Sequence, residues 1–238
     1  MPNPYFQFQQ FRIYHDKCAM KITQDASIFG AVIETNNADN ILDIGCGSGI
    51  LSIMLAQRTN AAITAIDIEK GACQQTEINI QNCPFNNTFN VICQDIKTFG
   101  LDGQISYDLI ICNPPYYSNQ DQRTNQEAYN LAKHANAGLD FESLSQSVGR
   151  ILSRNGAFWF ILPVYEAPKL IKQLEKNGLK LNYKLVIKHQ NQSQNARWIC
   201  QFRFIENKPK TEFLTVRNQD NSYTSLFQEK LKDYYIKF

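Results

Sequence analysis

The amino-acid sequence predicts an α/β fold, with a seven-stranded, mostly parallel sheet, helices on both of its faces and an antiparallel hairpin near the carboxyl end. Two patterns lead to this prediction. From about residue 40 to residue 177, apolar runs typical of buried strands alternate with segments whose apolar residues recur at helical spacing. After residue 178, apolar and polar residues alternate, which is typical of paired strands with one exposed face. A chain of 238 residues suits one large domain.

Each expected element follows from its local pattern. Five apolar runs predict the parallel strands, at 40–46, 61–68, 89–95, 107–113 and 157–163. Helical spacing, ended in places by proline or by Asn-Gly, predicts helices at 48–58, 69–82, 126–137, 141–153 and 166–177. The hairpin strands are expected at 179–189 and 197–206, around the polar loop 190–196, and a last helix is expected at 225–238.

The composition excludes several classes of protein. No apolar run reaches the roughly 18 residues that cross a bilayer, and the start of the chain lacks the pattern of a signal peptide. The seven cysteines include no Cys-x-x-Cys pair and the three histidines are far apart, so we expect reduced thiols and no metal site. We therefore expect a cytoplasmic monomer without a membrane segment.

Three glycines follow the first strand, in the stretch LDIGCGSG. Gly45, Gly47 and Gly49 permit a tight turn and the close approach of a ligand to the backbone. Similar turns occur in nicotinamide-dependent oxidoreductases, and the turn alone leaves that class open. The spacing G-x-G-x-G, together with Asp43 two residues before the first glycine, favours a nucleoside that carries a sulfonium over a dinucleotide.

Aspartates also mark the ends of the next two strands. Asp67 ends the second strand, where a carboxylate can accept hydrogen bonds from both hydroxyls of a ribose. Asp95 ends the third strand, where it can accept a hydrogen bond from an adenine amino group. Each aspartate alone is equally consistent with a turn cap. With Asp43, the three lie in register at the ends of three successive strands, which favours one nucleoside site.

The fourth strand stops at DLIICNPPYYSN. Proline cannot donate to a strand ladder and restricts the residue before it, so Asn113, Pro114, Pro115 and Tyr116 are expected to form a stiff loop. Ligands of open α/β sheets bind at this end of the strands. The loop therefore belongs to the same predicted site as the aspartates.

Together, ILDIGCGSG, AIDIE, CQD and NPPY resemble the class I S-adenosylmethionine-dependent methyltransferases that methylate amino groups. The resemblance implies a Rossmann-like fold with S-adenosyl-L-methionine as cofactor. It also implies that the Asn113 side-chain oxygen and the Pro114 carbonyl hold the target amine, while Tyr116 stacks on the base. The cofactor residues implied are Lys21, Asp25, Asp43, Gly45, Cys46, Gly47, Gly49, Asp67, Ile68, Asp95, Ile96 and Asn113.

Three further stretches, 11–32, 73–85 and 220–238, resemble the bacterial tRNA adenine-N6 methyltransferases. This resemblance implies methylation of adenosine N6 on the 3′ side of the anticodon in a valine tRNA. It also implies one domain, 1–238, in which residues 1–39 complete the site of a catalytic core at 40–238. The sequence departs from that family near Asp25 and at Cys46. Lys21 and Asp25 are equally consistent with a helix-entry pair.

Four alternatives stay open at this stage. Guanine-N2 methyltransferases of ribosomal RNA and glutamine methyltransferases of release factors share the Asn-Pro-Pro-Tyr loop, although the latter carry an N-terminal helical domain. Here only 39 residues precede the glycine-rich strand. An oxidoreductase leaves the loop after the fourth strand unexplained. A non-catalytic RNA-binding protein with the same fold is the fourth alternative.

Positive charge is concentrated in residues 150–217, which hold 13 basic and 4 acidic residues. Such asymmetry favours a polyanionic partner, here a tRNA, although a solvated charged surface gives the same pattern. Lysines three or four residues apart share one helix face, and lysines four apart share one strand face. The predicted RNA-binding residues are Lys169, Lys172, Lys176, Lys184, Lys188 and Arg197.

Overall fold

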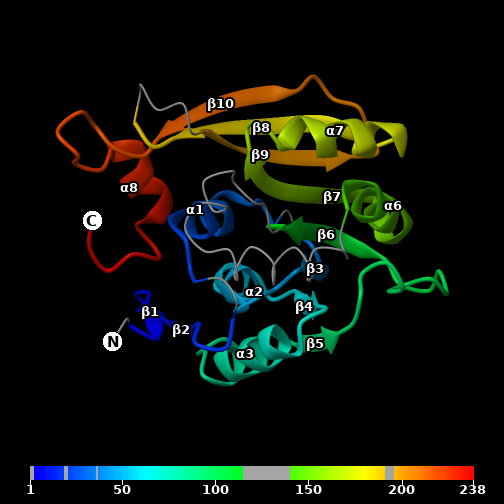
Figure 1. Ribbon diagram of the computed structural model, residues 1–238, viewed down its shortest axis with the longest axis horizontal. Coiled ribbons are helices and arrows are strands. Elements are labelled where there is room, and N and C mark those ends of the chain that lie inside the picture. Colours follow the sequence, from blue (N-terminus) through cyan, green and yellow to red (C-terminus); the bar gives the residue numbers. More distant parts are fainter. Residues whose placement is uncertain (1–2, 19–20, 36, 115–139, 191–195) are drawn as a thin grey trace, which may run out of the picture.

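The computed structural model describes residues 3–18, 21–35, 37–114, 140–190 and 196–238 (Figure 1). Its helices are α1 (Gln24–Val32), α2 (Ile50–Ala56), α3 (Lys70–Gln81), α6 (Phe141–Ile151), α7 (Ala167–Lys176) and α8 (Ser225–Leu231). Its strands are β1 (Tyr5–Gln7), β2 (Arg12–Tyr14), β3 (Asn40–Ile44), β4 (Ala62–Asp67), β5 (Phe89–Cys93), β6 (Tyr107–Cys112), β7 (Leu152–Pro163), β8 (Lys180–Lys188), β9 (Ala196–Arg203) and β10 (Lys210–Thr215).

One large sheet organises the described part of the chain, with the strand order β10-β8-β9-β7-β6-β3-β4-β5. The five strands from β5 to β7 are parallel neighbours. Strand β9 pairs antiparallel with both β7 and β8, which forms the expected hairpin. Strand β3 is the first strand of this sheet along the chain, yet it lies inside the sheet, between β6 and β4. The strand order therefore reverses at β3, and ligands of open α/β sheets bind at such reversals.

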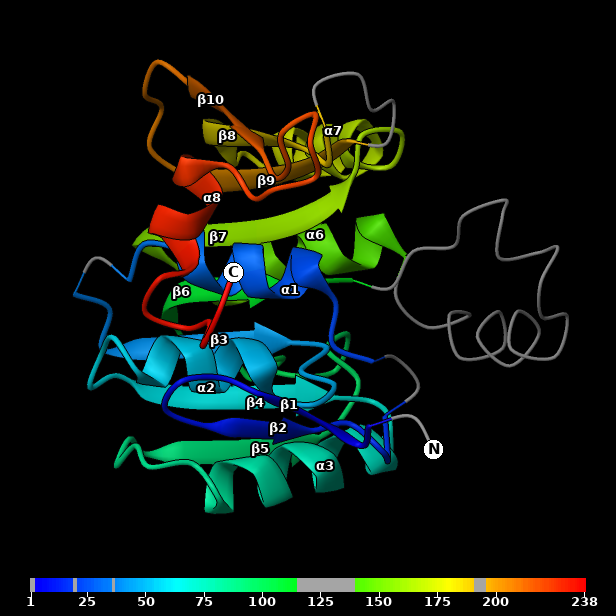
Figure 2. The same ribbon diagram turned by 90° about the vertical axis from the view of Figure 1, so that its left-hand side faces the viewer.

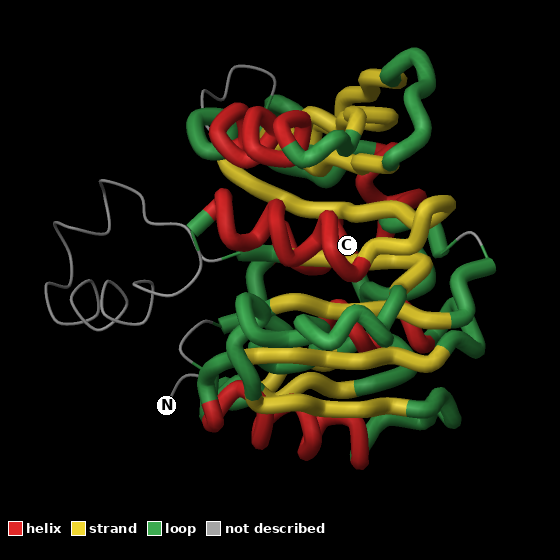
Figure 3. The backbone as a smooth tube through the Cα atoms, turned by 90° about the vertical axis from the view of Figure 1, so that its right-hand side faces the viewer, coloured by secondary structure: helices red, strands yellow, loops and turns green. Residues whose placement is uncertain are grey.

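Helices cover both faces of this sheet, as the two side views show (Figures 2 and 3). Helices α1, α2 and α8 lie on one face with the β1–β2 hairpin, and they share one apolar core with the sheet. Helices α6 and α7 lie on the other face over a second apolar core. The predicted α/β fold is confirmed. No helix in the described ranges is long and apolar enough to cross a membrane.

The sheet has one strand more than the seven expected. Strand β10 pairs in parallel with β8 at the sheet edge, where the Tyr183 hydroxyl donates to the Glu212 carboxylate at 2.8 Å. Only Leu214 of this strand is buried, so its sequence lacks the apolar pattern that marks an inner strand. The β1–β2 hairpin was also not expected, because strands of three residues give too short a pattern.

Two predicted element ends are wrong. Asn155-Gly156 was expected to end a helix, but it lies inside β7, which begins at Leu152. A Cβ on Gly156 would come within 3.0 Å of the Asp108 carbonyl, so glycine permits the close approach of β6 where the pairing is irregular. The last helix ends at Leu231 instead of 238, and the tail then pairs with Gln9. The helix expected at 126–137 lies outside the described residues.

Candidate functional site

The predicted site residues of the sheet lie at its carboxyl edge, because the parallel strands that carry them end together. In the strand register Ile44 pairs with Cys112, so Gly45 and Asn113 leave neighbouring strands side by side. Asp67 pairs with Cys93 in the same way, two residues before Asp95. The structure therefore joins residues from four strand ends, as the sequence predicted.

The glycine turn needs its glycines for two different reasons. Gly45, Gly47 and Gly49 all have positive φ, of 71°, 56° and 74°. A Cβ on Gly49 would lie 2.9 Å from the Thr76 side chain, so this glycine permits packing against α3. Apart from the glycine itself and its two chain neighbours, no atom of the described residues lies within 4 Å of an ideal Cβ on Gly45 or Gly47. The first two glycines thus leave open space beside the backbone, where a ligand can approach.

Asp43 is fully buried beneath this turn. Its Oδ2 accepts hydrogen bonds from the Ser52 hydroxyl at 2.7 Å and from the Ser52 amide at 3.2 Å. Burial raises the pKa of the Asp43 carboxyl to about 7, and the hydrogen bonds from Ser52 oppose this shift. Its Oδ1 has no hydrogen-bond partner among the described residues. Asp43 therefore orders the start of α2 and keeps one acceptor unused.

Asp67 is half-buried at the end of β4, and both of its carboxylate oxygens are held by backbone amides. Oδ2 accepts from Gly47 and Oδ1 accepts from Glu69, each at 3.0 Å. A carboxylate oxygen accepts more than one hydrogen bond, so a diol can still bind here. Ile68, the next residue, is 54% exposed, which provides an apolar surface beside Asp67. Ile96, the other isoleucine predicted to contact the cofactor, is instead packed into the core.

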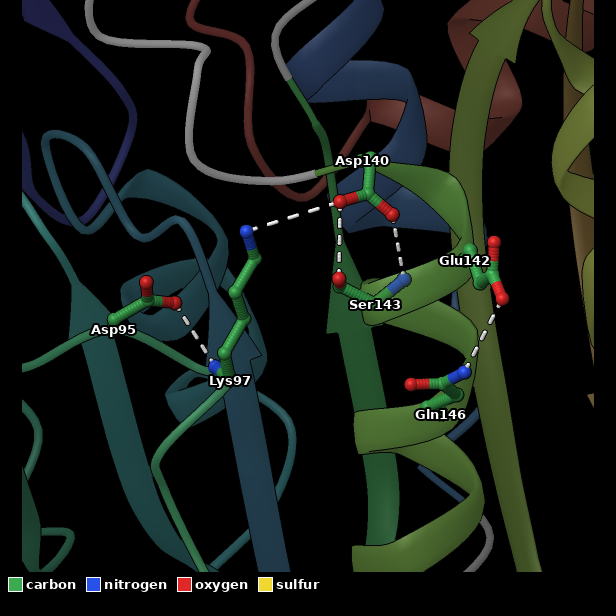
Figure 4. Close-up of polar contacts among 6 residues, drawn as sticks. All are labelled: Asp95, Lys97, Asp140, Glu142, Ser143 and Gln146. Carbon is green, nitrogen blue, oxygen red and sulfur yellow. Dashed lines mark hydrogen bonds and ion pairs between the residues drawn. The ribbon is translucent and has the colours of Figure 1, made fainter.

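The turn after β5 is held by α6, as Figure 4 shows. The Asp95 side chain accepts from the Lys97 amide at 2.9 Å, while Lys97 Nζ lies 3.8 Å from the Asp140 carboxylate. Asp140 caps α6 through the Ser143 amide at 2.8 Å. Arg150, farther along α6, donates to the carbonyls of residues 96, 97 and 99. The geometry of Asp95 thus depends on a helix that the sequence did not connect to it.

Two members of the Asn-Pro-Pro-Tyr loop are described. Strand β6 ends at Cys112, and Asn113 follows half-buried at the carboxyl edge. Pro114 is buried. Pro115 and Tyr116 lie outside the described residues. Asn113 is thus the member of the predicted catalytic loop that leaves the sheet beside the glycine turn.

Asp25 is paired with a residue that was predicted to bind RNA. It lies in the first turn of α1, and its Oδ2 is 3.0 Å from Arg197 Nε. Arg197 pairs with Pro163, the last residue of β7, so this ion pair lies at the carboxyl edge. Lys21 is exposed before α1. The two predicted roles, cofactor contact and RNA contact, therefore meet in one ion pair.

The lysines of the basic half differ in their surroundings. Lys172 and Lys176 are exposed on α7. Lys169 pairs with Glu166 at 2.8 Å, and Lys184 lies over the Trp198 ring at 4.5 Å from its centroid. Lys188 is half-buried at the end of β8. Lys169 is exposed as well but is held by Glu166, so Lys172 and Lys176 are the most accessible of the five to a polyanion.

Sequence reasoning missed three polar residues on α3. Gln75, Thr76 and Asn79 are all buried. Asn79 donates to the Ser48 carbonyl at 2.8 Å and Thr76 donates to the Gly47 carbonyl at 3.0 Å, so α3 holds the glycine turn from outside. A signal was present in the sequence, since polar residues at inward positions of a helix need partners.

Comparison with protein families adds a sequence relationship. The family model described as the methyltransferase small domain matches residues 18–143. The chain is 35% identical over 236 residues to the tRNA1(Val) (adenine(37)-N6)-methyltransferase of Phocaeicola vulgatus, and this match covers 99% of each chain.

Solved structures give the same fold. A predicted O-methyltransferase from Agrobacterium tumefaciens superposes with a TM-score of 0.66 at 14% identity, over 88% of this chain and 96% of that one. The N-methyltransferase NodS from Bradyrhizobium japonicum, in complex with S-adenosyl-L-homocysteine, gives a TM-score of 0.54 at 17% identity, over 77% and 86% of the two chains. At these identities the likeness shows the fold alone, which is that of the class I methyltransferases.

Proposed function

The chain belongs to the family of the tRNA1(Val) (adenine(37)-N6)-methyltransferases, and from this premise we propose that it methylates N6 of adenosine 37, on the 3′ side of the anticodon, in a valine tRNA. As a member of the family it is a methyltransferase that uses S-adenosyl-L-methionine. One structural observation carries the proposal. An open glycine turn, strand-end aspartates and Asn113 meet at one edge of the sheet.

The residues present fit this cofactor. The open space beside Gly45 and Gly47 admits a nucleoside close to the backbone. Asp67 is ordered by two amide donors and can accept from ribose hydroxyls, with Ile68 beside it as an apolar surface. The unused Oδ1 of Asp43 adds a buried acceptor near the turn. When bound, the cofactor supplies a methyl group on a sulfonium, which is already a good leaving group.

Because the leaving group is good, the protein contributes mainly by positioning the amine. The Asn113 carboxamide oxygen and the Pro114 carbonyl are proposed to accept hydrogen bonds from the exocyclic NH₂. Bonds in these directions favour a pyramidal nitrogen whose lone pair faces the methyl carbon. Tyr116 is proposed to stack on the base and Pro115 to stiffen the loop. Exclusion of water would strengthen each of these hydrogen bonds.

We further propose that residues 1–238 act as one domain in the cytoplasm, with residues 1–39 completing the site. The tRNA is proposed to lie along the basic half, where Lys172 and Lys176 are exposed to phosphates. Phosphate contacts position the RNA and carry no base readout. Selection of the adenosine is therefore assigned to the Asn113 loop. The comparisons do not favour the guanine-N2 and glutamine alternatives.

A product assay tests the proposal. Purified enzyme, S-adenosyl-L-methionine and a valine tRNA transcript are incubated, and the nucleosides are then measured by mass spectrometry. The expected product is N6-methyladenosine, and it should disappear when the transcript carries guanosine at position 37. A product of N2-methylguanosine would keep the proposed chemistry and contradict the proposed substrate. Methylation of the position-37 variant would contradict the proposed site on the tRNA.

A further inference from the structure

One face of α3 faces the chain that follows β2. Gly71, Gln75 and Asn79 recur every four residues, so they form a single stripe on this helix. We call these three residues the docking stripe and the chain it meets segment 14–18. Gln75 and Asn79 are buried, with 1% and 0% of their surface exposed. Two buried amides in one stripe require specific partners, since an unpaired buried amide is costly.

Segment 14–18 supplies those partners. Asn79 Oδ1 accepts from the Tyr14 amide at 2.9 Å, and Asn79 Nδ2 donates to the Tyr14 carbonyl at 2.8 Å. Gln75 Oε1 accepts from the Lys17 amide at 2.9 Å. A Cβ on Gly71 would lie 3.0 Å from the Lys17 carbonyl, so glycine lets the segment approach the helix. The docking stripe thus fixes the backbone of the segment by side-chain amides.

Asn79 also reaches the glycine turn. The same Nδ2 that bonds Tyr14 donates to the Ser48 carbonyl at 2.8 Å. All the donors and acceptors of this side chain are therefore divided between segment 14–18 and the turn. A shift of either partner leaves part of a fully buried amide unpaired.

The segment continues toward the proposed ribose acceptor. Burial and the negative charge of Asp67 raise the pKa of the Cys18 thiol to about 12. Segment 14–18 therefore runs from the docking stripe into electrostatic reach of Asp67. One end of the segment is thus linked to the glycine turn through Asn79, and the other end lies within electrostatic reach of Asp67.

We propose that the docking stripe couples the seating of segment 14–18 to cofactor affinity, with Asn79 as the positioning residue that both share. A cofactor that orders the glycine turn should then also favour the position of segment 14–18 against α3. In turn, fixing segment 14–18 against α3 should favour cofactor binding by the same coupling free energy. Gln75 bonds the segment at the Lys17 amide, so we expect its loss to release the segment and, through Asn79, to weaken cofactor binding. The inference rests on the cofactor site proposed above.

Calorimetric titration with S-adenosyl-L-homocysteine tests this coupling. Gln75→Met keeps the shape of the side chain and removes the acceptor for Lys17, and it should weaken binding about fivefold or more. Gln74→Met, the same change at the exposed neighbouring position, is the matched control and should bind like wild type. Asn79→Asp places a second acceptor against two carbonyls and should weaken binding more than Gln75→Met does.

Hydrogen exchange separates coupling from a merely structural role. In the wild type, S-adenosyl-L-homocysteine should slow exchange of the Tyr14 and Lys17 amides, and Gln75→Met should remove most of that protection. If Gln75→Met folds poorly, Gly71→Ala replaces it, because alanine favours the helix while its Cβ displaces Lys17.

The possible failures are distinguishable. A wild-type protein that does not bind S-adenosyl-L-homocysteine refutes the proposed cofactor site together with this inference. A wild type that binds, with Gln75→Met and Gly71→Ala of equal affinity, overturns the coupling alone. A Gln75→Met variant that only lowers the melting temperature, with affinity unchanged, assigns the stripe to stability and likewise overturns the coupling.

Discussion

At the scale of single residues, the site depends on carboxylates that the backbone holds in place. Asp67 receives amides from the glycine turn and from the start of the next helix, and Asp43 receives both donors of Ser52. Side chains held in this way are ordered before a ligand arrives, which lowers the entropy cost of binding. The two aspartates differ in burial, and this difference leads to two separate predictions.

Asp67→Ala should weaken the binding of S-adenosyl-L-homocysteine several-fold. The change removes the acceptor for ribose hydroxyls and frees the Gly47 amide, at a cost of roughly 1–3 kcal/mol. Calorimetry with Asp102→Ala, an exposed aspartate outside the site, provides the control. Equal affinities for the two variants would assign the ribose contact to another residue.

Asp43 should make stability depend on pH. Burial raises the pKa of its carboxyl to about 7 in the folded state, well above the value in an unfolded chain. Between about pH 4 and pH 7 the folded state binds more protons at this group, so its contribution to stability falls as the pH rises and levels off above 7. Asp43→Asn removes the titrating carboxyl and with it this dependence of stability on pH.

Urea unfolding of wild type and Asp43→Asn between pH 4.5 and 8 measures the effect. The free energy of unfolding of wild type, relative to that of the variant, should fall across this range. A difference that does not change with pH would show that Asp43 keeps an ordinary pKa in the folded protein.

At the scale of elements, the strand ends bring together site residues that lie up to 70 positions apart in the sequence, as Asp43 and Asn113 do. Residues such as Asp67 and Asn113 could be placed from the sequence, because parallel strands end at one edge and each strand is marked by an apolar run. The pairing of Asp25 with Arg197 could not, since it depends on where the first turn of α1 lies relative to the start of β9. Asn79 was missed for the same reason, because its partners come from two distant segments.

The missed elements share a physical cause. Strands β1 and β2 have three residues each, and β10 buries one side chain, so their patterns are too short to detect. Asn155-Gly156 has the composition of a helix end, yet tertiary pairing with β6 places it in a strand. At these positions the local sequence pattern was weaker than the long-range contacts that determine the secondary structure.

Helix α6 should stabilise the turn that carries Asp95. Arg150 donates to three carbonyls of residues 96–99, so Arg150→Met leaves partly buried acceptors unpaired and should lower stability by about 1–3 kcal/mol. Urea unfolding measures this loss, with Arg154→Met as the control on a neighbouring strand. Equal loss in both variants would mean that the three carbonyl bonds contribute nothing specific.

At the scale of the whole molecule, charge is divided between two parts of the chain. Residues 150–217 are basic, while the rest of the chain is acidic overall. Part of that positive charge serves the fold, since Arg150, Lys169 and Arg197 have partners within the protein. The exposed lysines of α7 remain the clearest candidates for contact with a polyanion.

Reversing the charge of Lys172 and Lys176 together should weaken tRNA binding and reduce its dependence on salt. Each lost phosphate contact should lower the slope of log affinity against log salt by roughly 0.7–0.9. Cofactor affinity should be unchanged. The matched control reverses Lys230 and Lys232, which are exposed at the end of α8, the helix on the other face of the sheet from α7 (Figure 2). If both pairs give the wild-type slope, α7 is not the RNA surface.

The proposed role of Asn113 is to direct an adenosine amine toward the methyl group of the cofactor. It is tested most directly by single-turnover methylation of a valine tRNA with Asn113→Ala, alongside titration of the variant with S-adenosyl-L-homocysteine. Loss of one positioned partner should cost about 2 kcal/mol of transition-state stabilisation, which is roughly a thirtyfold slower formation of N6-methyladenosine at position 37. Cofactor affinity should stay within about twofold of wild type, because the bond matters most in the transition state. A variant that transfers the methyl group at the wild-type rate would contradict this role of Asn113.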